Sequence, residues 1–311
     1  MAEENMTLAL LCALVFVNGA TDAVASVSSA VSCGALGMRT AVRLSALFNF
    51  IGMTASALLF PQIAGAVASS AGIEGDAALC AVMLTVVLWA GAAWYFGIPT
   101  SESHAVAAAI WGCALFTGGI YAVDFAAAAR LILWLVLSCS IGWCGAYALR
   151  TVMCGRSGRH DVLLIRISCA VMSFWHGAQD GQKFIGLYML AHCTNAPPPL
   201  AVIAVGAAIM AAGTRVGGGR IVDKISRELG VMNTRESLIC DISASLSLCA
   251  ASVAGAPVST THVRTCAAAG AQRSPDRGIL RELAIAWALT FPACTAIAYA
   301  ITFIISLFGG I

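Results

Sequence analysis

The chain has 311 residues, of which 60% are hydrophobic and only 10% are charged, with a net charge of +2. About 25% of the residues of a typical soluble domain are charged. With a mean hydropathy of +0.89, this composition excludes a soluble globular fold and predicts that lipid surrounds most of the surface. The small net charge indicates no nucleic-acid partner. The 13 cysteines show no CxxC spacing, so we interpret them as packing residues.

The apolar runs give the order of the expected helices. In the first half they fall at 6–33, 41–60, 77–96, 103–118 and 125–149, and in the second half at 162–192, 199–216, 237–255, 261–271 and 283–308. A straight helix needs roughly 20 residues to cross a bilayer, so the runs at 6–33 and 162–192 are too long, and those after Pro99 and Pro257 are short. Lipid admits only helices or closed barrels, and the alternation of a barrel is absent. We therefore expect an all-α polytopic membrane protein with broken or re-entrant helices.

An internal repeat relates the two halves. The segment FVNGATD ends at Asp22 and the segment FWHGAQD ends at Asp180, an offset of 158. The segments GIPTSESH and GAPVSTTH, which end at His104 and His262, show the same offset. Two motifs that recur at one offset indicate two copies of one structural unit.

Basic residues distinguish the two copies. The loop near 61–76 is acidic, whereas its equivalent near 219–234 is basic, and several arginines surround the connection between the halves. Lys and Arg mark the cytoplasmic side, so the repeats should have inverted topology. We predict an N-terminal transmembrane repeat over 1–149, a cytoplasmic linker over 150–161 and an inverted C-terminal repeat over 162–311. The expected location is a bacterial inner (plasma) membrane, with both termini outside the cytoplasm.

Two aspartates lie inside apolar runs at equivalent positions. Asp22 and Asp180 each follow a Gly-Ala pair. An ionisable residue inside a span costs roughly 2.5–3.5 kcal/mol to insert and is a functional candidate by default. A carboxylate beside freed backbone carbonyls suits a small hard cation such as Na⁺, and it equally suits a proton. The alternative is a buried aspartate that caps half of a broken helix.

The second pair of motifs predicts helix N-termini. Pro99 and Pro257 are each followed by hydroxyl residues, a histidine and an apolar run, which is typical of a helix start. Such a terminus presents free N–H groups and the positive end of the helix dipole to an anion. Simple helix capping is the alternative. We expect the following hydroxyl residues to meet around one central anion: Ser101, Ser103, Ser259, Thr260 and Thr261.

Together, GATDAVAS, GAQDGQK and GAPVSTTH resemble the signatures of the inorganic phosphate transporter (PiT) family, and the resemblance extends from about residue 10 to 308. It implies a transporter that moves phosphate, or in one branch sulfate, with Na⁺ or H⁺ as the coupling ion and no other cofactor. The partners expected are the anion and membrane lipid, with a homodimer left open. The resemblance further implies that Asp22 and Asp180 bind coupling cations and substrate, that the hydroxyls bind the anion, and that Gln182 and Lys183 belong to the second signature.

The chain departs from these signatures at several positions. The asparagine before each aspartate is Thr21 in the first half and Gln179 in the second. We keep both residues as candidate ligands of Na⁺ and substrate. Glu102 stands where a small polar residue is usual, and it should repel an anion unless it is protonated or paired with a cation. For His104 and His262 we expect hydrogen bonds to the broken backbone.

The sequence has three alternatives to phosphate import. Sulfate is one, since hydroxyls and helix N-termini bind either tetrahedral anion. Phosphate near neutral pH still donates a hydrogen bond, so an acceptor such as Glu102 would favour it over sulfate. A non-transporting sensor built on the same fold is a second alternative, and the retention of both Asp22 and Asp180 argues against it. An enzyme is not expected, because the chain has no phosphate-binding loop of the GxxxxGK[ST] type and no nucleophile–base pattern.

Overall fold

The structure is a computed structural model that describes residues 2–69, 75–96, 101–153, 159–228, 232–275 and 277–308. Within these ranges all regular structure is helical, and eight helices are long and apolar enough to cross a membrane. Many large apolar side chains face outward, for example Leu58 with 72% of its surface exposed. This outer surface is the one expected of a protein surrounded by lipid.

The first half contains the helices α1 (Ala2–Thr21), α2 (Ser28–Ser32), α3 (Met38–Leu59), α4 (Gln62–Ser69), α5 (Asp76–Phe96), α6 (Glu102–Gly118) and α7 (Phe125–Val152), with short 3₁₀ segments η1 (Ala23–Val27) and η2 (Gly119–Ala122). The second half contains α8 (Arg159–Ala191), α9 (Leu200–Glu228), α10 (Thr234–Val253), α11 (Thr260–Ala271) and α12 (Arg277–Leu307). The helix ends limit the connection between the halves to 153–158, within the predicted linker. Most of the predicted basic loop near 219–234 is helical, because α9 continues to Glu228.

The two halves interlock through matched helix crossings. A Cβ atom added to Gly19 of α1 would lie 2.1 Å from the carbonyl oxygen of Met210 in α9. The same distance separates a Cβ added to Gly52 of α3 from the carbonyl oxygen of Phe174 in α8. Met210 is the repeat equivalent of Gly52, so the α1–α9 crossing and the α3–α8 crossing are copies of each other. Each half thus packs its first helix against the other half, at a distance that only glycine permits.

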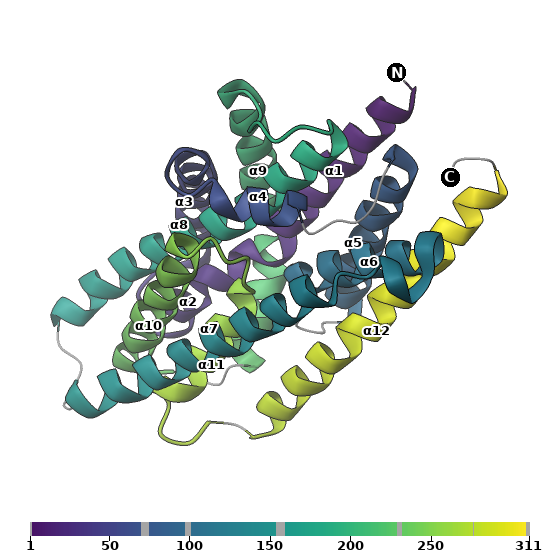
Figure 1. The fold of residues 1–311 in the computed structure, drawn as a ribbon. Helices are drawn as coiled ribbons and strands as arrows, with labels where there is room; N and C mark the ends of the chain where they lie inside the picture. Colours follow the sequence, from purple (N-terminus) through teal and green to yellow (C-terminus); the bar gives the residue numbers. More distant parts are fainter. Residues whose placement is uncertain are drawn as a thin grey trace.

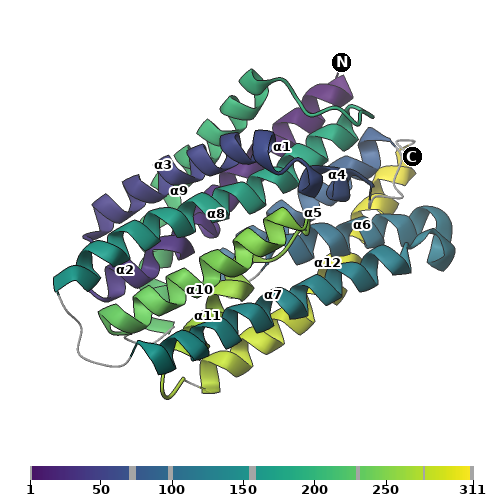
Figure 2. The same ribbon diagram turned by 60° about the vertical axis from the view of Figure 1, so that its left-hand side comes forward.

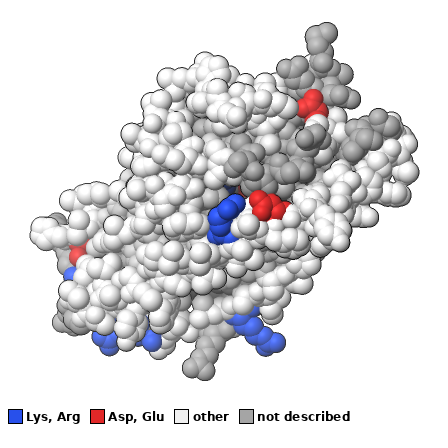
Figure 3. Space-filling model, in the orientation of Figure 1, with Lys and Arg blue, Asp and Glu red and all other residues white. Residues whose placement is uncertain are grey.

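The repeats run in opposite directions, as predicted. The N-terminus of α1 and the C-terminus of α12 lie at one end of the molecule, called here the termini end (Figures 1 and 2). Helix α8, the equivalent of α1, begins at the opposite end, called here the linker end (Figure 2). On the face drawn in Figure 3, most of the few Lys and Arg side chains lie along the lower edge and most of the surface carries no charge. The fold is therefore an inverted repeat.

Two helical hairpins enter the molecule and return to the end from which they came. The hairpin of α10 and α11, called hairpin 2, is fixed at the linker end, because Arg235 pairs with Asp161 at 2.9 Å and Arg150 donates to the carbonyl of Gln272. Hairpin 1, formed by α5 and α6, enters from the termini end. The tips meet in the interior, where the Ser103 hydroxyl donates to the carbonyl of Val258 at 3.2 Å. The predicted short elements after Pro99 and Pro257 are thus re-entrant.

The two long runs behave differently from each other. The first is broken, since α1 ends at Thr21 and is followed by η1 and α2. The second forms one continuous helix of 33 residues, α8, which is longer than a ~30 Å hydrocarbon layer requires at 1.5 Å per residue. The expectation that both runs are broken was therefore wrong for α8. At the linker end Arg159, His160 and Asp161 precede the apolar segment.

Candidate functional site

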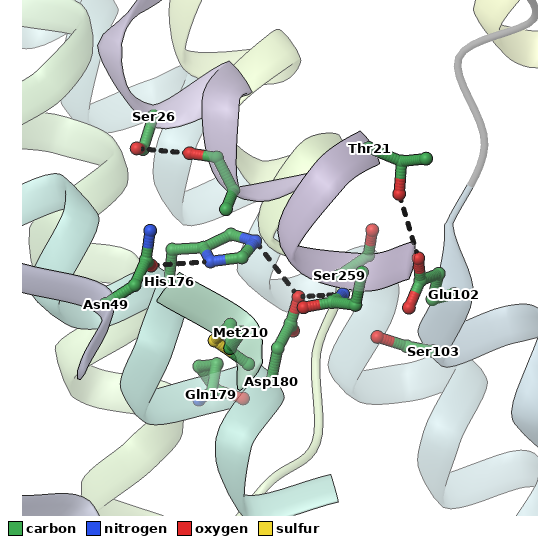
Figure 4. A network of polar contacts seen from close by, with 12 residues as sticks. Thr21, Ser26, Asn49, Glu102, Ser103, His176, Gln179, Asp180, Met210 and Ser259 are labelled. Atoms are coloured by element: carbon green, nitrogen blue, oxygen red, sulfur yellow. Dashed lines mark hydrogen bonds and ion pairs between the residues drawn. The ribbon is translucent and has the colours of Figure 1, made fainter. Parts of the chain in front are cut away.

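The candidate site lies where four elements meet: the break after α1, the middle of α8, and the tips of hairpins 1 and 2. Figure 4 shows Thr21, Glu102, Ser103, His176, Asp180 and Ser259 gathered there. The repeat motifs from opposite halves are thus brought together, as the sequence predicted. All six of these residues are polar, and four of them are buried: Glu102, His176, Asp180 and Ser259.

Asp180 has a full set of partners. Its Oδ2 atom accepts a hydrogen bond from Asn18 at 3.0 Å and lies 3.1 Å from Nε2 of His176. Its Oδ1 atom lies 2.5 Å from the Nζ atom of Lys183, one turn further along α8. The side chains of Asp180 and Lys183 are 4% and 5% exposed. A buried ion pair with added hydrogen bonds is the arrangement in which a carboxylate tolerates burial.

Lys183 is held entirely by oxygen atoms. Besides Asp180, its ammonium group donates to the hydroxyl of Ser103 at 2.5 Å and to the carbonyl of Val258 at 2.8 Å. Ser103 belongs to hairpin 1 and Val258 to hairpin 2. The lysine therefore joins α8 to both hairpin tips. Through its contact with Asp180, Lys183 is the partner of an acidic residue.

The first half presents its carboxylates differently. Asp22 directly follows α1, and its backbone N–H donates to the carbonyl of Asn18 at 2.9 Å. Its carboxylate makes no hydrogen bond to any described residue. It lies within electrostatic reach of the acidic residues Glu102 and Asp180 and of His176 and Lys183. The Oε1 atom of Glu102 accepts from the hydroxyl of Thr21 at 3.0 Å, while its buried Oε2 atom has no hydrogen-bond partner among the described residues. Of the three carboxylates at the site, those with oxygens that lack hydrogen-bond partners among the described residues are therefore the two of the first half.

The hydroxyl residues fall into two groups. Ser101 and Ser259 are N-caps of α6 and α11, accepting from the backbone N–H groups of His104 and His262 at 3.4 and 3.3 Å. The capping interpretation therefore holds for these two. The hydroxyls of Thr260 and Thr261 make no hydrogen bond to described side chains or backbone, and they lie on the first turn of α11. They remain available to an anion at the helix N-terminus.

Gln179 and Gln182 point away from this centre. The Nε2 atom of Gln179 donates to Ser252 at 2.8 Å, and its Oε1 atom accepts from the backbone N–H of Val258 at 3.4 Å. Gln179 thus fastens the tip of hairpin 2 instead of facing Asp180, although it stands in the place of the signature asparagine. Gln182 donates to Ser56 of α3 at 3.3 Å. Its partner is outside the site.

The two motif histidines meet each other. The rings of His104 and His262 have centroids 4.5 Å apart, and the ring of His262 lies 3.8 Å from that of Trp287. Both ring nitrogens of His262 and the Nδ1 atom of His104 lack hydrogen-bond partners within the described ranges. The expectation that these rings hydrogen-bond the broken backbone is wrong for those atoms. The histidines instead pack the two hairpins together.

Several contributors were missed by the sequence reasoning. Asn18 contacts Asp180, and Asn49 of α3 lies 2.9 Å from the Nδ1 atom of His176. An asparagine inside an apolar run is a signal that could have identified both. Asp241 of α10 is fully buried and accepts from Ser29 at 2.8 and 2.9 Å. It is the ionisable residue that the same rule should have found.

Arg264 lies beside Asp241 and outside the site. Its Nη2 atom is 3.8 Å from Asp241, and its Nη1 atom donates to Ser28 at 2.7 Å. The guanidinium is 3% exposed, so it does not reach the membrane surface, and the acidic residue beside it is Asp241, not Glu102.

A coupling cation would need more than acidic side chains. In the described ranges, no three His, Cys, Asp or Glu side chains are arranged to hold one metal ion. A cation at Asp22 would therefore take carbonyl and hydroxyl oxygens as well, which broken membrane helices supply.

Comparison with known proteins gives the family. The chain matches the Phosphate transporter family over residues 18–159 and again over 156–298. This protein belongs to the phosphate transporter family. The double match also reproduces the internal repeat that the sequence motifs and the interlocked helices show.

Curated relatives extend over nearly the whole chain. A probable low-affinity inorganic phosphate transporter of Bacillus subtilis (strain 168) is 27% identical over 94% of this chain and 95% of its own length. A protein of the same description from Rhizobium meliloti (strain 1021) is 28% identical over 91% and 90%. A solved structure described as the sodium-dependent phosphate transporter has a TM-score of 0.83, with 17% identity, over 99% of this chain and 100% of that one. This member of the phosphate transporter family is thus an integral membrane protein from a family of transporters, not of enzymes.

Proposed function

We propose that this protein is a secondary active transporter that imports inorganic phosphate together with Na⁺ or H⁺. The observation that carries the proposal is the meeting of two hairpin tips, each with a helix N-terminus, beside three carboxylates and one ammonium group. Helix N-termini and free hydroxyls attract an oxyanion. The surplus of carboxylate repels it unless cations or protons enter as well. Such a site binds anion and cation together or not at all, which is the basis of coupled transport.

Phosphate is the anion that the site favours. The Oε2 atom of Glu102 is a buried acceptor without a partner among the described residues. Phosphate near neutral pH carries a proton that can fill this acceptor, whereas sulfate has none, and an unfilled buried acceptor costs about 1–3 kcal/mol. The inorganic phosphate transporters among the relatives support the same choice.

The inverted repeat supplies a route for alternating access. Sites in such transporters lie between the repeats, and rocking of one unit against the other exposes them to each side in turn. Here the tips of hairpins 1 and 2 belong to opposite halves and enter from opposite ends. A motion that separates one hairpin from its neighbours would open the site toward one end only.

Uptake into proteoliposomes tests the proposal. Labelled phosphate should accumulate when a Na⁺ or H⁺ gradient is imposed, and labelled sulfate should not. Asp22→Asn should abolish gradient-driven accumulation, because it removes the carboxylate that is free to bind a cation. Asp124→Asn is the matched control: Asp124 is an exposed N-cap of α7, and asparagine caps a helix about as well as aspartate.

Binding measurements separate coupling from transport. Cation should raise phosphate affinity and phosphate should raise cation affinity by the same factor, since linkage is reciprocal. If phosphate accumulates under neither gradient, the proposed function is wrong. If phosphate affinity in Asp22→Asn still rises with cation as in the wild type, Asp22 is not the coupling ligand.

A further inference from the structure

We infer that the ammonium group of Lys183 is a built-in cation that fills the cation site of the second half, so that mobile coupling cations bind only in the first half, at Asp22 and Glu102. The inference rests on the proposed function and goes further, because it assigns the cation sites and their occupants. It rests on the contacts of Lys183, on the saturation of Asp180 and on the contrast between the halves.

The contacts of Lys183 are those of a small hard cation. Its Nζ atom touches a carboxylate oxygen of Asp180, the hydroxyl of Ser103 and the carbonyl of Val258, at 2.5, 2.5 and 2.8 Å. Carboxylate, hydroxyl and carbonyl oxygens are the donors that hard metal ions prefer. These donors come from α8 and from both hairpin tips, as expected of a site whose occupant holds the halves together.

Both carboxylate oxygens of Asp180 already contact other groups of the chain. One of its oxygen atoms contacts Lys183, and the other contacts Asn18 and His176 at 3.0 and 3.1 Å. Its side chain is 4% exposed. A mobile ion could reach this carboxylate only by displacing the lysine, which is covalently attached one helical turn away.

The first half lacks this arrangement. The residue that corresponds to Lys183 at the offset of 158 is Ala25, which has no charge. Asp22, the equivalent of Asp180, makes no hydrogen bond to described residues through its carboxylate, and buried oxygen atoms of Glu102 and Asn18 also lack partners there. Two aspartates that the repeat makes equivalent in sequence therefore differ in their contacts. Asp180 pairs directly with the ammonium of Lys183, whereas Asp22 feels the charge of Lys183 only from a distance.

The consequence concerns coupling. A tethered cation occupies its site whatever the salt concentration, so it aids anion binding without being carried across the membrane. Phosphate binding by the wild type should therefore depend on mobile cation only through the first-half site. The Na⁺ dependence of phosphate affinity in the wild type should then be less steep than in a variant that lacks the ammonium group.

Removing the ammonium should convert the second-half site into one for a mobile cation. In Lys183→Ala we expect phosphate affinity to fall about tenfold or more at low Na⁺, as for the loss of a charged contact. High Na⁺ or methylammonium should restore it, and the Na⁺ dependence should become steeper than in the wild type. Choline chloride keeps the ionic strength constant. Lys224→Ala, which removes the chain's other lysine, should behave as the wild type does.

A second measurement needs no phosphate. Na⁺ should raise the melting temperature of Lys183→Ala more than that of the wild type, because a ligand that binds the native state stabilises it. The double variant Asp180→Asn with Lys183→Ala lacks the carboxylate and should lose this extra stabilisation. If Lys183→Ala cannot be purified, Lys183→Gln takes its place in both measurements.

Two results would overturn the inference. One is a folded Lys183→Ala protein whose phosphate affinity and melting temperature respond to Na⁺ as the wild type does. The other is a loss of phosphate binding that neither Na⁺ nor methylammonium restores. Failure of the proposed function would instead appear as wild-type protein that binds no phosphate, while the melting-temperature measurement would still decide the occupant of the second-half site.

Discussion

At the scale of single residues, equivalent positions in the two repeats need not have the same contacts. The motif spacing predicted that Asp22 and Asp180 lie at one site, and the structure brings them within electrostatic reach. It did not predict that Lys183 and His176 would saturate only Asp180, because partners in a folded chain depend on helix direction and rotamer. Gln179 shows the same limit: its longer side chain reaches the tip of hairpin 2, where an asparagine on α8 would stop short.

The hydroxyl residues give a prediction at this scale. Thr260→Ala should weaken phosphate binding without a large loss of stability, because its hydroxyl makes no hydrogen bond to the described residues. Ser259→Ala should also lower stability by about 1 kcal/mol, since it removes the N-cap of α11. A lost hydrogen bond to a charged ligand corresponds to about a tenfold or greater rise in Kd. Phosphate titration and thermal unfolding of both variants measure the two effects. Wild-type affinity in Thr260→Ala would show that this hydroxyl does not contact the anion.

At the scale of helices, the sequence predicted correctly where helices begin, because a helix start depends on residues next to it in the chain. Each proline followed by hydroxyl residues predicted a helix start, and α6 and α11 begin at Glu102 and Thr260 with serine N-caps. The sequence did not distinguish broken α1 from continuous α8, since both carry Gly-Ala-X-Asp. The close helix contacts do not distinguish them either, because Gly19 of α1 lies against the backbone of Met210 just as Gly177 of α8 lies against that of Asn49.

The buried pair of Asp241 and Arg264 gives a prediction at the scale of helices. Ser29 of α2 donates to Asp241, and Ser28 of α2 accepts from Arg264. The pair therefore joins the first half to hairpin 2. The equivalent residues in hairpin 1 are Met83 and Val106, which are apolar. Arg264→Met should destabilise the protein by about 3–5 kcal/mol, because it leaves a buried carboxylate without its counter-charge. Arg264→Met with Asp241→Leu should recover much of that loss.

Thermal or denaturant unfolding of the two single variants and the double variant gives the coupling energy directly. A double variant whose loss equals the sum of the two single losses would show that the pair does not act as a unit. The contact would then be incidental to the joining of α2 and hairpin 2.

At the scale of the whole molecule, the architecture was the most predictable property. An offset of 158 shared by two motifs indicated the repeat, and loops of opposite charge indicated its inversion. The packing of α1 against α9 and of α3 against α8, each across the two halves, was not predictable. It depends on which glycine contacts which backbone, as Gly19 contacts Met210 and Gly52 contacts Phe174. The spacing of apolar residues identifies the buried face of a helix but not the helix that packs against it.

The last prediction concerns orientation in the membrane. Asp76 and Thr234 are the first residues of α5 and α10, and they are repeat equivalents at the offset of 158. Hairpins 1 and 2 therefore begin at opposite ends of the molecule. Because Lys and Arg mark the cytoplasmic side, the basic region before Thr234 should be cytoplasmic and Asp76 should be outside, together with both termini.

Single cysteines at these two positions, in a background without the native cysteines, test this orientation. A membrane-impermeant maleimide added to intact cells should label Asp76→Cys and not Thr234→Cys, and inside-out vesicles should give the reverse. Labelling of both positions from the same side would contradict the inverted arrangement in the membrane. Reversed labelling would keep the inversion and place the linker end outside, so the hairpin that faces incoming phosphate would be hairpin 2, with Arg264 and Asp241 on the entry side.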